Sequence, residues 1–238
     1  MKFEIYRYVG PSHLAPDGRL SVRSLVDFMQ DCSIFQLDSE QTLDAWFKAN
    51  DAGMFLAHRQ IHIVRMPVHG ERMRIVTWVY RCNPSYGLRN TNMYDAEGNV
   101  CVYSCASGAF VSYATGQMVR VPDEVLHTVP LYEPYPMEYL PRRIAIPRGV
   151  EAVEHEPMFV WRFLTDANRH VNNARYISVA QEYLPEGYGF SRIRVEYHIP
   201  AKYGERMFPK VYSPDLDTTT VALDNEEGEH YAVVEFHK

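Results

Sequence analysis

The strongest constraint on how this 238-residue chain folds is a predicted helix that is apolar around much of its circumference. Four of its residues have the i, i+3, i+4, i+7 spacing of one helix face: Leu25, Phe28, Met29 and Cys32. Val22, Val26 and Phe35 widen that apolar surface further. A helix of this kind is normally wrapped by other structure, so we expect it to be buried against a sheet.

Strand-like runs follow this helix at residues 55–66, 72–82, 87–94 and 100–113. The loop from Asp95 to Asn99 separates the last two runs, and Gly98 is available there for a positive φ. The first residues of the chain also alternate as a strand does. The first half therefore predicts one long helix lying on an antiparallel meander.

The same order of elements recurs in the second half. Residues 159–164 predict a strand, and a helix face follows at Tyr176, Val179, Ala180, Tyr183 and Leu184. Residues 191–198, 206–212, 218–224 and 231–237 then alternate like strands. Each half would be a long buried helix wrapped by an antiparallel sheet, which is the hotdog unit. We expect an α+β fold of two such units in tandem.

A proline-rich segment joins the two halves. Five of the fifteen prolines lie between Thr128 and Val150, and each removes a backbone donor and fixes φ. This composition predicts an extended connector. We therefore expect an N-terminal hotdog at residues 1–130, a linker at 131–152 and a C-terminal hotdog at 153–238.

Short polar side chains are concentrated where the second helix is expected to begin. The segment T-D-A-N-R-H-V-N-N contains Asp166, Asn168 and His170, which alternate and would point to one side of an extended chain. A carboxylate beside an imidazole fixes its tautomer, and an Asn amide can donate to a carbonyl oxygen. Asp166 alone could equally be a helix N-cap, but the trio indicates a hydrolytic site.

The segment D-A-N-R-H-V-N-N-A-R-Y-I resembles the D-x-N-x-H-V-N-N-x-x-Y-I motif of acyl-acyl-carrier-protein (acyl-ACP) thioesterases. Three further segments resemble the first half of that family: I-V-T-W-V at 75–79, G-L-R-N at 87–90 and the run from Ser107 to Val125. The resemblance implies tandem hotdogs that hydrolyse the thioester of fatty acyl-ACP and release free fatty acid. It also implies an acyl pocket in the first hotdog and catalysis by Asp166, Asn168 and His170 in the second.

One position departs from the family pattern. Plant members carry a segment resembling E-Y-R-R-E-C-G, whose second Glu is assigned a role in activating water. Here the segment starting at Glu196 has Pro200 and Ala201 in place of that Glu and the following Cys. Glu196 is four residues earlier on the predicted strand, roughly 13 Å away, and Glu205 lies beyond the next turn, so we carry over neither.

The mechanism expected from these residues uses a reduced set of groups. Asn168 and the amides of the helix start would polarise the thioester carbonyl, and His170, held by Asp166, would activate water. Asp166 acting as the base with His170 as an orienting donor is the alternative. An acyl-coenzyme A thioesterase and a hotdog that binds acyl-pantetheine without cleaving it are the competing functions, and Pro200 favours the second of these.

Other classes of function find little support in the sequence. The formal net charge of −6 predicts no general attraction to nucleic acid. His58 and His62 lie in a strand-like run that would hold them roughly 13 Å apart, so we expect no metal site. The sequence has no G-x-S-x-G elbow and no P-loop or dinucleotide fingerprint, and we expect no cofactor. The four cysteines have no zinc-site spacing and predict reduced thiols.

The expected partner is ACP, which is strongly acidic and docks on positive surface. Candidate contacts are Arg120, Arg142, Arg143, Arg148, Arg169 and Arg175. The chain starts with a strand pattern rather than a signal peptide or an apolar span, so we expect a cytoplasmic protein without membrane insertion. Two hotdogs in one chain already supply the usual pair, and a homodimer through exposed sheet edges is the alternative to a monomer.

Overall fold

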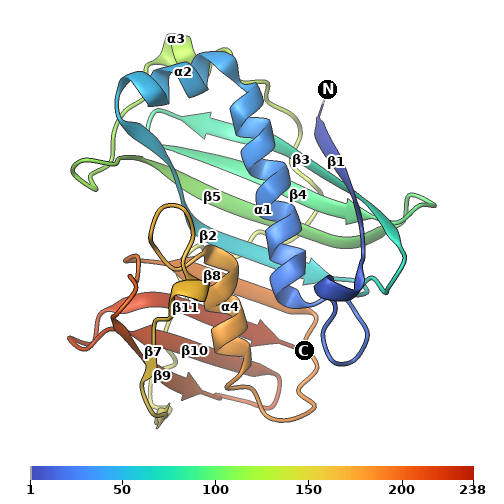
Figure 1. The fold of residues 1–238 in the computed structure, drawn as a ribbon, viewed down its shortest axis with the longest axis vertical. Coiled ribbons are helices and arrows are strands. Elements are labelled where there is room, and N and C mark those ends of the chain that lie inside the picture. The colour runs from blue at the N-terminus through green and yellow to red at the C-terminus, as the bar shows by residue number, and fades with distance from the viewer. Residues whose placement is uncertain (1) are drawn as a thin grey trace. The chain divides into compact units, whose positions relative to one another are not determined.

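The computed structural model describes residues 2–238, which divide into two compact units. Unit 1 contains the residues up to Arg59 together with Ile63–Tyr139, and unit 2 contains Leu140–Lys238 together with Gln60–His62. Each unit combines an antiparallel sheet with one main helix, α1 in unit 1 and α4 in unit 2 (Figure 1). All four cysteines are free thiols, as predicted.

The sheet of unit 1 has the strand order β1-β3-β4-β5-β2. Its strands are β1 (Phe3–Tyr8), β2 (Ala52–Ile63), β3 (Arg72–Asn83), β4 (Tyr86–Tyr94) and β5 (Val100–Ser112). Its helices are α1 (Val22–Ser39), α2 (Gln41–Ala49) and α3 (Asp123–Leu126), preceded by the short 3-10 helix η1 (Pro11–His13).

Helix α1 is the buried helix that the sequence predicts. The Ser21 side chain caps it by accepting a hydrogen bond from Ser24 N. Leu25 and Met29 are fully buried, and α1 packs on β1, β3 and β4 across one face of the sheet (Figure 1). Phe35 was expected in the buried surface, but it is 45% exposed near the C-terminal end of the helix.

The sheet of unit 2 has the strand order β8-β11-β10-β9, and two short strands both pair with β9. Its strands are β6 (Val153–Glu154), β7 (Met158–Phe159), β8 (Arg192–Tyr197), β9 (Arg206–Tyr212), β10 (Thr218–Asp224) and β11 (His230–His237). Its helices are η2 (Arg162–Leu164) and α4 (Asn173–Gln181). Read from β7, this order repeats that of unit 1, so the α+β tandem hotdog is confirmed.

Two predicted elements differ from the structure. The strand expected at 159–164 ends at Phe159, because the chain then forms η2, in which Leu164 N donates to Trp161 O. The second helix ends at Gln181, so Tyr183 and Leu184 lie in a turn beyond it. Pro185 disfavours helical backbone at the residue before it, which accounts for the early end.

The proline-rich connector has no regular secondary structure over most of its length, and part of it is held by unit 2. Residues 133–152 form no helix or strand. Ile144 packs on Ala222 and Val233 of the sheet, and its backbone N–H donates to a carboxylate oxygen of Glu196 at 2.8 Å. Arg194 donates to the carbonyl oxygen of Pro141 at 2.6 Å. These contacts fix the middle of the connector, at Pro141 and Ile144, against β8, β10 and β11.

Candidate active site

Asp166, Asn168 and His170 lie on one tight turn between η2 and α4. Asp166 N donates to His170 O at 2.9 Å, and Arg169 N donates to Asp166 O at 2.9 Å. Arg169 has a left-handed φ of 62°. The sequence predicted an extended segment whose alternation would align the three side chains. That prediction was wrong, because the chain reverses within five residues; the turn, rather than a strand pleat, brings the three residues together.

The Asp166 carboxylate organises this turn but does not cap the helix. Its Oδ1 accepts a hydrogen bond from Asn168 N at 2.9 Å, and its Oδ2 has only a long contact of 3.5 Å with the Asn172 amide group. The N-cap of α4 is Asn172, whose side chain accepts from Ala174 N. Asn172 O also accepts from Arg175 N, so two of the helix-start amides expected to face a substrate are already bonded.

Unit 1 contains a second copy of the same backbone frame. Ala15 N donates to Arg19 O at 2.8 Å, and Gly18, with a φ of 79°, donates its N–H to Ala15 O. Leu14 bridges Leu20 there, as Thr165 bridges Val171 in unit 2. Each turn lies between a 3-10 helix and the capped start of the main helix. Positions in this frame correspond at a constant offset of 151 residues.

Comparing the side chains at matched positions of the two turns shows which of them the backbone frame does not require. Ala15, Asp17 and Arg19 occupy the places of Asp166, Asn168 and His170. The turn therefore closes without a carboxylate at the first position or an imidazole at the last. Its backbone geometry does not account for the side chains that unit 2 carries there, and a role beyond folding is favoured.

A buried tyrosine lies behind the turn in unit 2. Ala201 N donates to the Tyr176 hydroxyl at 2.8 Å, while Ala201 O accepts from Val171 N. Burial raises the pKa of Tyr176, and the nearby carboxylates of Glu205 and Asp166 add to the rise. Sequence analysis assigned Tyr176 only to the apolar face of the helix.

In the residues of unit 1 that the structure describes, the hydrogen bond between Tyr176 and Ala201 has no counterpart. Leu25 and Pro67 occupy the corresponding places, and Pro67 has no N–H to satisfy. In unit 2 the loop before β9 offers a buried N–H, and the tyrosine accepts it. The hydroxyl thereby ties α4 to the backbone segment that pairs with the turn, since His170 bridges Lys202.

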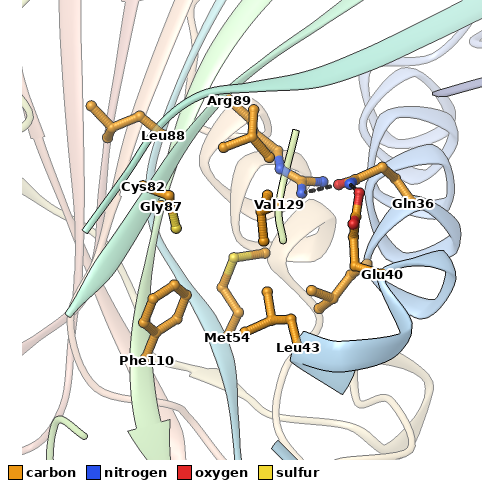
Figure 2. Close-up of a pocket in the computed structure, with 12 residues that line it drawn as sticks. Gln36, Glu40, Leu43, Met54, Cys82, Gly87, Leu88, Arg89, Phe110 and Val129 are labelled. Carbon is orange, nitrogen blue, oxygen red and sulfur yellow. Dashed lines mark hydrogen bonds between the residues drawn. The ribbon is translucent and has the colours of Figure 1, made fainter. Parts of the chain in front are cut away.

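Unit 1 encloses an apolar pocket between the bend from α1 to α2 and the sheet (Figure 2). Its cavity of about 20 Å³ has mainly apolar walls, among them Leu43, Met54, Phe110 and Val129. Met54 lies against β5 at Gly108, where an added Cβ would come within 2.5 Å of the Met54 Cγ. Glycine at this position is therefore what lets the flexible Met54 side chain form one wall.

One end of this pocket is polar. Arg89 is buried and donates to Gln36 Oε1 at 2.6 Å and to Ser33 O at 2.8 Å. Gln36 passes the contact on by donating to Glu40 at 2.6 Å, as the dashed lines in Figure 2 show. Burial lowers the pKa of Arg89 to about 10, which leaves the guanidinium charged at neutral pH.

Comparisons with known proteins agree with this double architecture. The N-terminal domain model of acyl-ACP thioesterases matches residues 9–129, and the C-terminal domain model matches residues 149–235. The chain belongs to the acyl-ACP thioesterase family. This thioesterase is therefore a hydrolase that cleaves the thioester of fatty acyl-ACP, as the sequence predicted.

Solved structures show the same fold over the whole length of the thioesterase. An acyl-ACP thioesterase from Bacteroides thetaiotaomicron is 19% identical, with a TM-score of 0.88, and the match covers 99% of this chain and 97% of that one. The 12:0-ACP thioesterase from Umbellularia californica is 13% identical, with a TM-score of 0.86 and coverage of 99% and 96%. A search of curated protein sequences finds no match.

The two carboxylates nearest to Pro200 in the sequence are both committed elsewhere. Glu196 accepts from Ile144 N on the connector. Glu205 accepts from Lys202 N at 2.8 Å and from the Tyr231 hydroxyl at 3.0 Å. Glu71 makes the same bond to Val68 N in unit 1, so this use of a glutamate belongs to the shared frame of the thioesterase.

No helix among residues 2–238 of the thioesterase is both long and apolar enough to cross a membrane.

Proposed function

We propose that the thioesterase hydrolyses fatty acyl-ACP at a centre formed by Asp166, Asn168 and His170. The observation that carries the proposal is the contrast between the two turns. The same backbone frame forms in unit 1 with Ala15, Asp17 and Arg19, so folding does not require the three polar side chains of unit 2. Their chemistry suits hydrolysis of a thioester.

In the proposed reaction, water attacks the thioester carbonyl carbon and the thiolate of the phosphopantetheine arm leaves. Asn168 has an exposed side chain whose amide N–H groups would donate to the developing oxyanion. His170 would take the proton from water and return it to the departing thiolate.

Asp166 would act chiefly by position. Its Oδ1 holds the Asn168 backbone at 2.9 Å, while its Oδ2 has only the long contact to Asn172 and could accept from water or from the His170 ring. The alternative, with Asp166 as the base and His170 orienting it, uses that same oxygen atom.

The acyl chain would enter the pocket of unit 1, so that residues 1–130 bind the chain, residues 131–152 connect and residues 153–238 catalyse. The apolar walls around Leu43, Met54 and Phe110 support this division. A cavity of about 20 Å³ is narrow for an acyl chain, so flexible side chains such as Met54 would move aside as the substrate enters.

Release of free thiol from a panel of acyl chains, each presented on ACP and on coenzyme A, tests the proposal. We expect the wild type to prefer the carrier protein and His170→Ala to lose at least 100-fold in kcat. Arg19→Ala, at the matching place in unit 1, is the control and should retain activity. An equal preference for coenzyme A would favour the acyl-CoA alternative, and binding without turnover would mean that Pro200 marks a hotdog without catalysis.

Two further parts of the proposal concern the cell. We expect the thioesterase in the cytoplasm as a monomer, with a homodimer as the alternative. Cell fractionation and sedimentation velocity, respectively, measure these properties directly.

A further inference from the structure

We propose that four exposed aromatic residues beside the catalytic turn form the docking surface for the acidic ACP. This aromatic patch consists of Phe159, Trp161, Phe163 and Tyr203, all in unit 2. The proposal rests on the proposed function, because it assumes that ACP delivers the substrate to this turn.

Three rings of the patch are in contact, and all four residues are exposed to solvent. The rings of Phe159 and Trp161 have centroids 5.0 Å apart, and those of Phe159 and Tyr203 are 6.1 Å apart. Trp161 is 55% exposed and Phe163 is 74% exposed. Clustered exposed aromatic groups mark interaction sites, since each offers a large apolar area to a partner.

The patch adjoins the catalytic turn through the backbone. Trp161 precedes η2 and Phe163 lies within it. The chain continues from η2 through Thr165 to Asp166. Tyr203 follows Lys202, and Lys202 forms a bridge with His170. A protein that covers the patch would therefore lie over the entrance to the proposed centre.

Unit 1 shows that the frame itself does not require these aromatic groups. Val9 and Val160 occupy matched positions, because Val9 N donates to Glu71 O and Val160 N donates to Glu205 O. The residues after Val9 are Gly10, Pro11 and Ser12, where unit 2 has Trp161, Arg162 and Phe163. Small side chains are sufficient for the same local fold, so the large ones in unit 2 need another explanation.

Charge identifies the class of partner. Four exposed cationic residues lie on the segments that carry the patch and the catalytic turn: Arg162, Arg169, Lys202 and Arg206. The Arg162 guanidinium lies 4.8 Å from the centre of the Tyr203 ring. Aromatic residues and arginine are enriched at protein interfaces and dominate their binding energy.

Two observations refine this charge argument. Glu205 lies among the cations, but its carboxylate already binds Lys202 N and Tyr231. Glu226 and Glu227 line the adjoining groove together with Lys202 and Arg206. Arg169 keeps a left-handed backbone where unit 1 uses Gly18, so a cation is retained at a strained position. The engaged Glu205 carboxylate and the Arg169 cation both suit an acidic protein partner.

The test compares two substrates of the intact thioesterase, each with the acyl chain that the wild type hydrolyses fastest. One is acyl-ACP and the other is the same acyl group on pantetheine. The variant Trp161→Ala/Phe163→Ser should raise KM for acyl-ACP by about tenfold or more with little change in kcat. It should leave kcat/KM for acyl-pantetheine unchanged. Leu216→Ser, an exposed apolar residue in another loop of unit 2, is the matched control.

Charge is tested separately with Arg162→Gln. This variant should weaken binding of holo-ACP, followed by fluorescence anisotropy, more at low salt than at high salt. Equal binding at both salt concentrations would remove the electrostatic part of the proposal.

Other results would overturn the docking surface. An equal loss on both substrates would mean that the patch acts on the pantetheine arm or on the turn. Unchanged KM with altered sedimentation or lost binding to anionic phosphatidylglycerol vesicles would assign the patch to a second copy of the chain or to lipid. If the wild type hydrolyses nothing, the proposed function fails, while holo-ACP binding by the double variant still decides the docking surface.

Discussion

Replacing Asp166 with alanine, the residue that unit 1 carries at the same place, distinguishes catalysis from folding. The substitution removes one good hydrogen bond, from Asn168 N at 2.9 Å, and a long contact of 3.5 Å that adds little. The bond is solvent-accessible, so we expect a loss of about 1 kcal/mol in the free energy of unfolding. For a chain of this size that lowers Tm by about 2–4 °C.

The size of the fall in kcat then shows whether Asp166 takes part in catalysis or only holds the turn. If Asp166 only held the turn, about 1 kcal/mol could reduce the population of the active turn by roughly fivefold. If it takes part in proton transfer or orients His170, we expect kcat to fall by about 100-fold or more. Thiol release and thermal unfolding of the same preparation measure both effects.

Unit 1 supplies the control for this experiment. Asp17 Oδ1 accepts from Arg19 N at 3.0 Å, which is the same kind of bond in the matching turn. Asp17→Ala should lower Tm by a similar amount and leave kcat within a factor of two or three. If Asp166→Ala retained more than about a fifth of the wild-type kcat, the carboxylate would be structural and the reasoning refuted.

Three further predictions follow from single contacts: those of Tyr176 and Met54 described above, and the contact between the Asp224 carboxylate and the His230 ring. Tyr176→Phe leaves the buried Ala201 N–H without its acceptor, so Tm should fall by about 2–6 °C and kcat should drop while KM stays constant; unchanged kcat would contradict a positioning role. Met54→Ala should shift the preferred acyl chain to a longer one, measured with the thiol-release panel, and an unchanged profile would place the chain elsewhere. Asp224 raises the pKa of His230, so their pairing stabilises fully below about pH 6.5 and less as the pH rises through the raised pKa; His230→Gln should cost about 1 kcal/mol in denaturant unfolding at about pH 5.5 and less at about pH 9.

Strands were the most predictable part of the fold. Residues 206–212 and 218–224 form β9 and β10 with the expected bounds. In β9 buried residues alternate with more exposed ones, which gives the period-two pattern its strength. In β10 both faces are buried from Thr219 to Asp224. The helix α1 was equally predictable, because a helix that is apolar on most sides must be buried against other structure.

The position of the turn that carries the candidate site could be predicted from the sequence, but its backbone conformation could not. Alternation of Asp166, Asn168 and His170 suggested extended backbone, yet Arg169 adopts a positive φ that non-glycine residues seldom take. Nothing local marks such a residue in advance. The hydrogen bond between Tyr176 and Ala201 joins residues 25 positions apart, and a contact at that separation leaves no periodic signal.

Covalent duplication also changes what substitution can do to this protein. A symmetric pair of identical hotdog chains must accept every mutation twice, so a residue that improves a reaction centre also alters the matching position of the partner. Here the codons for positions 15–19 and 166–170 vary independently. The turn of unit 2 can therefore carry an imidazole and a carboxylate, while the turn of unit 1 has the same backbone frame with glycine and alanine and supports its own helix.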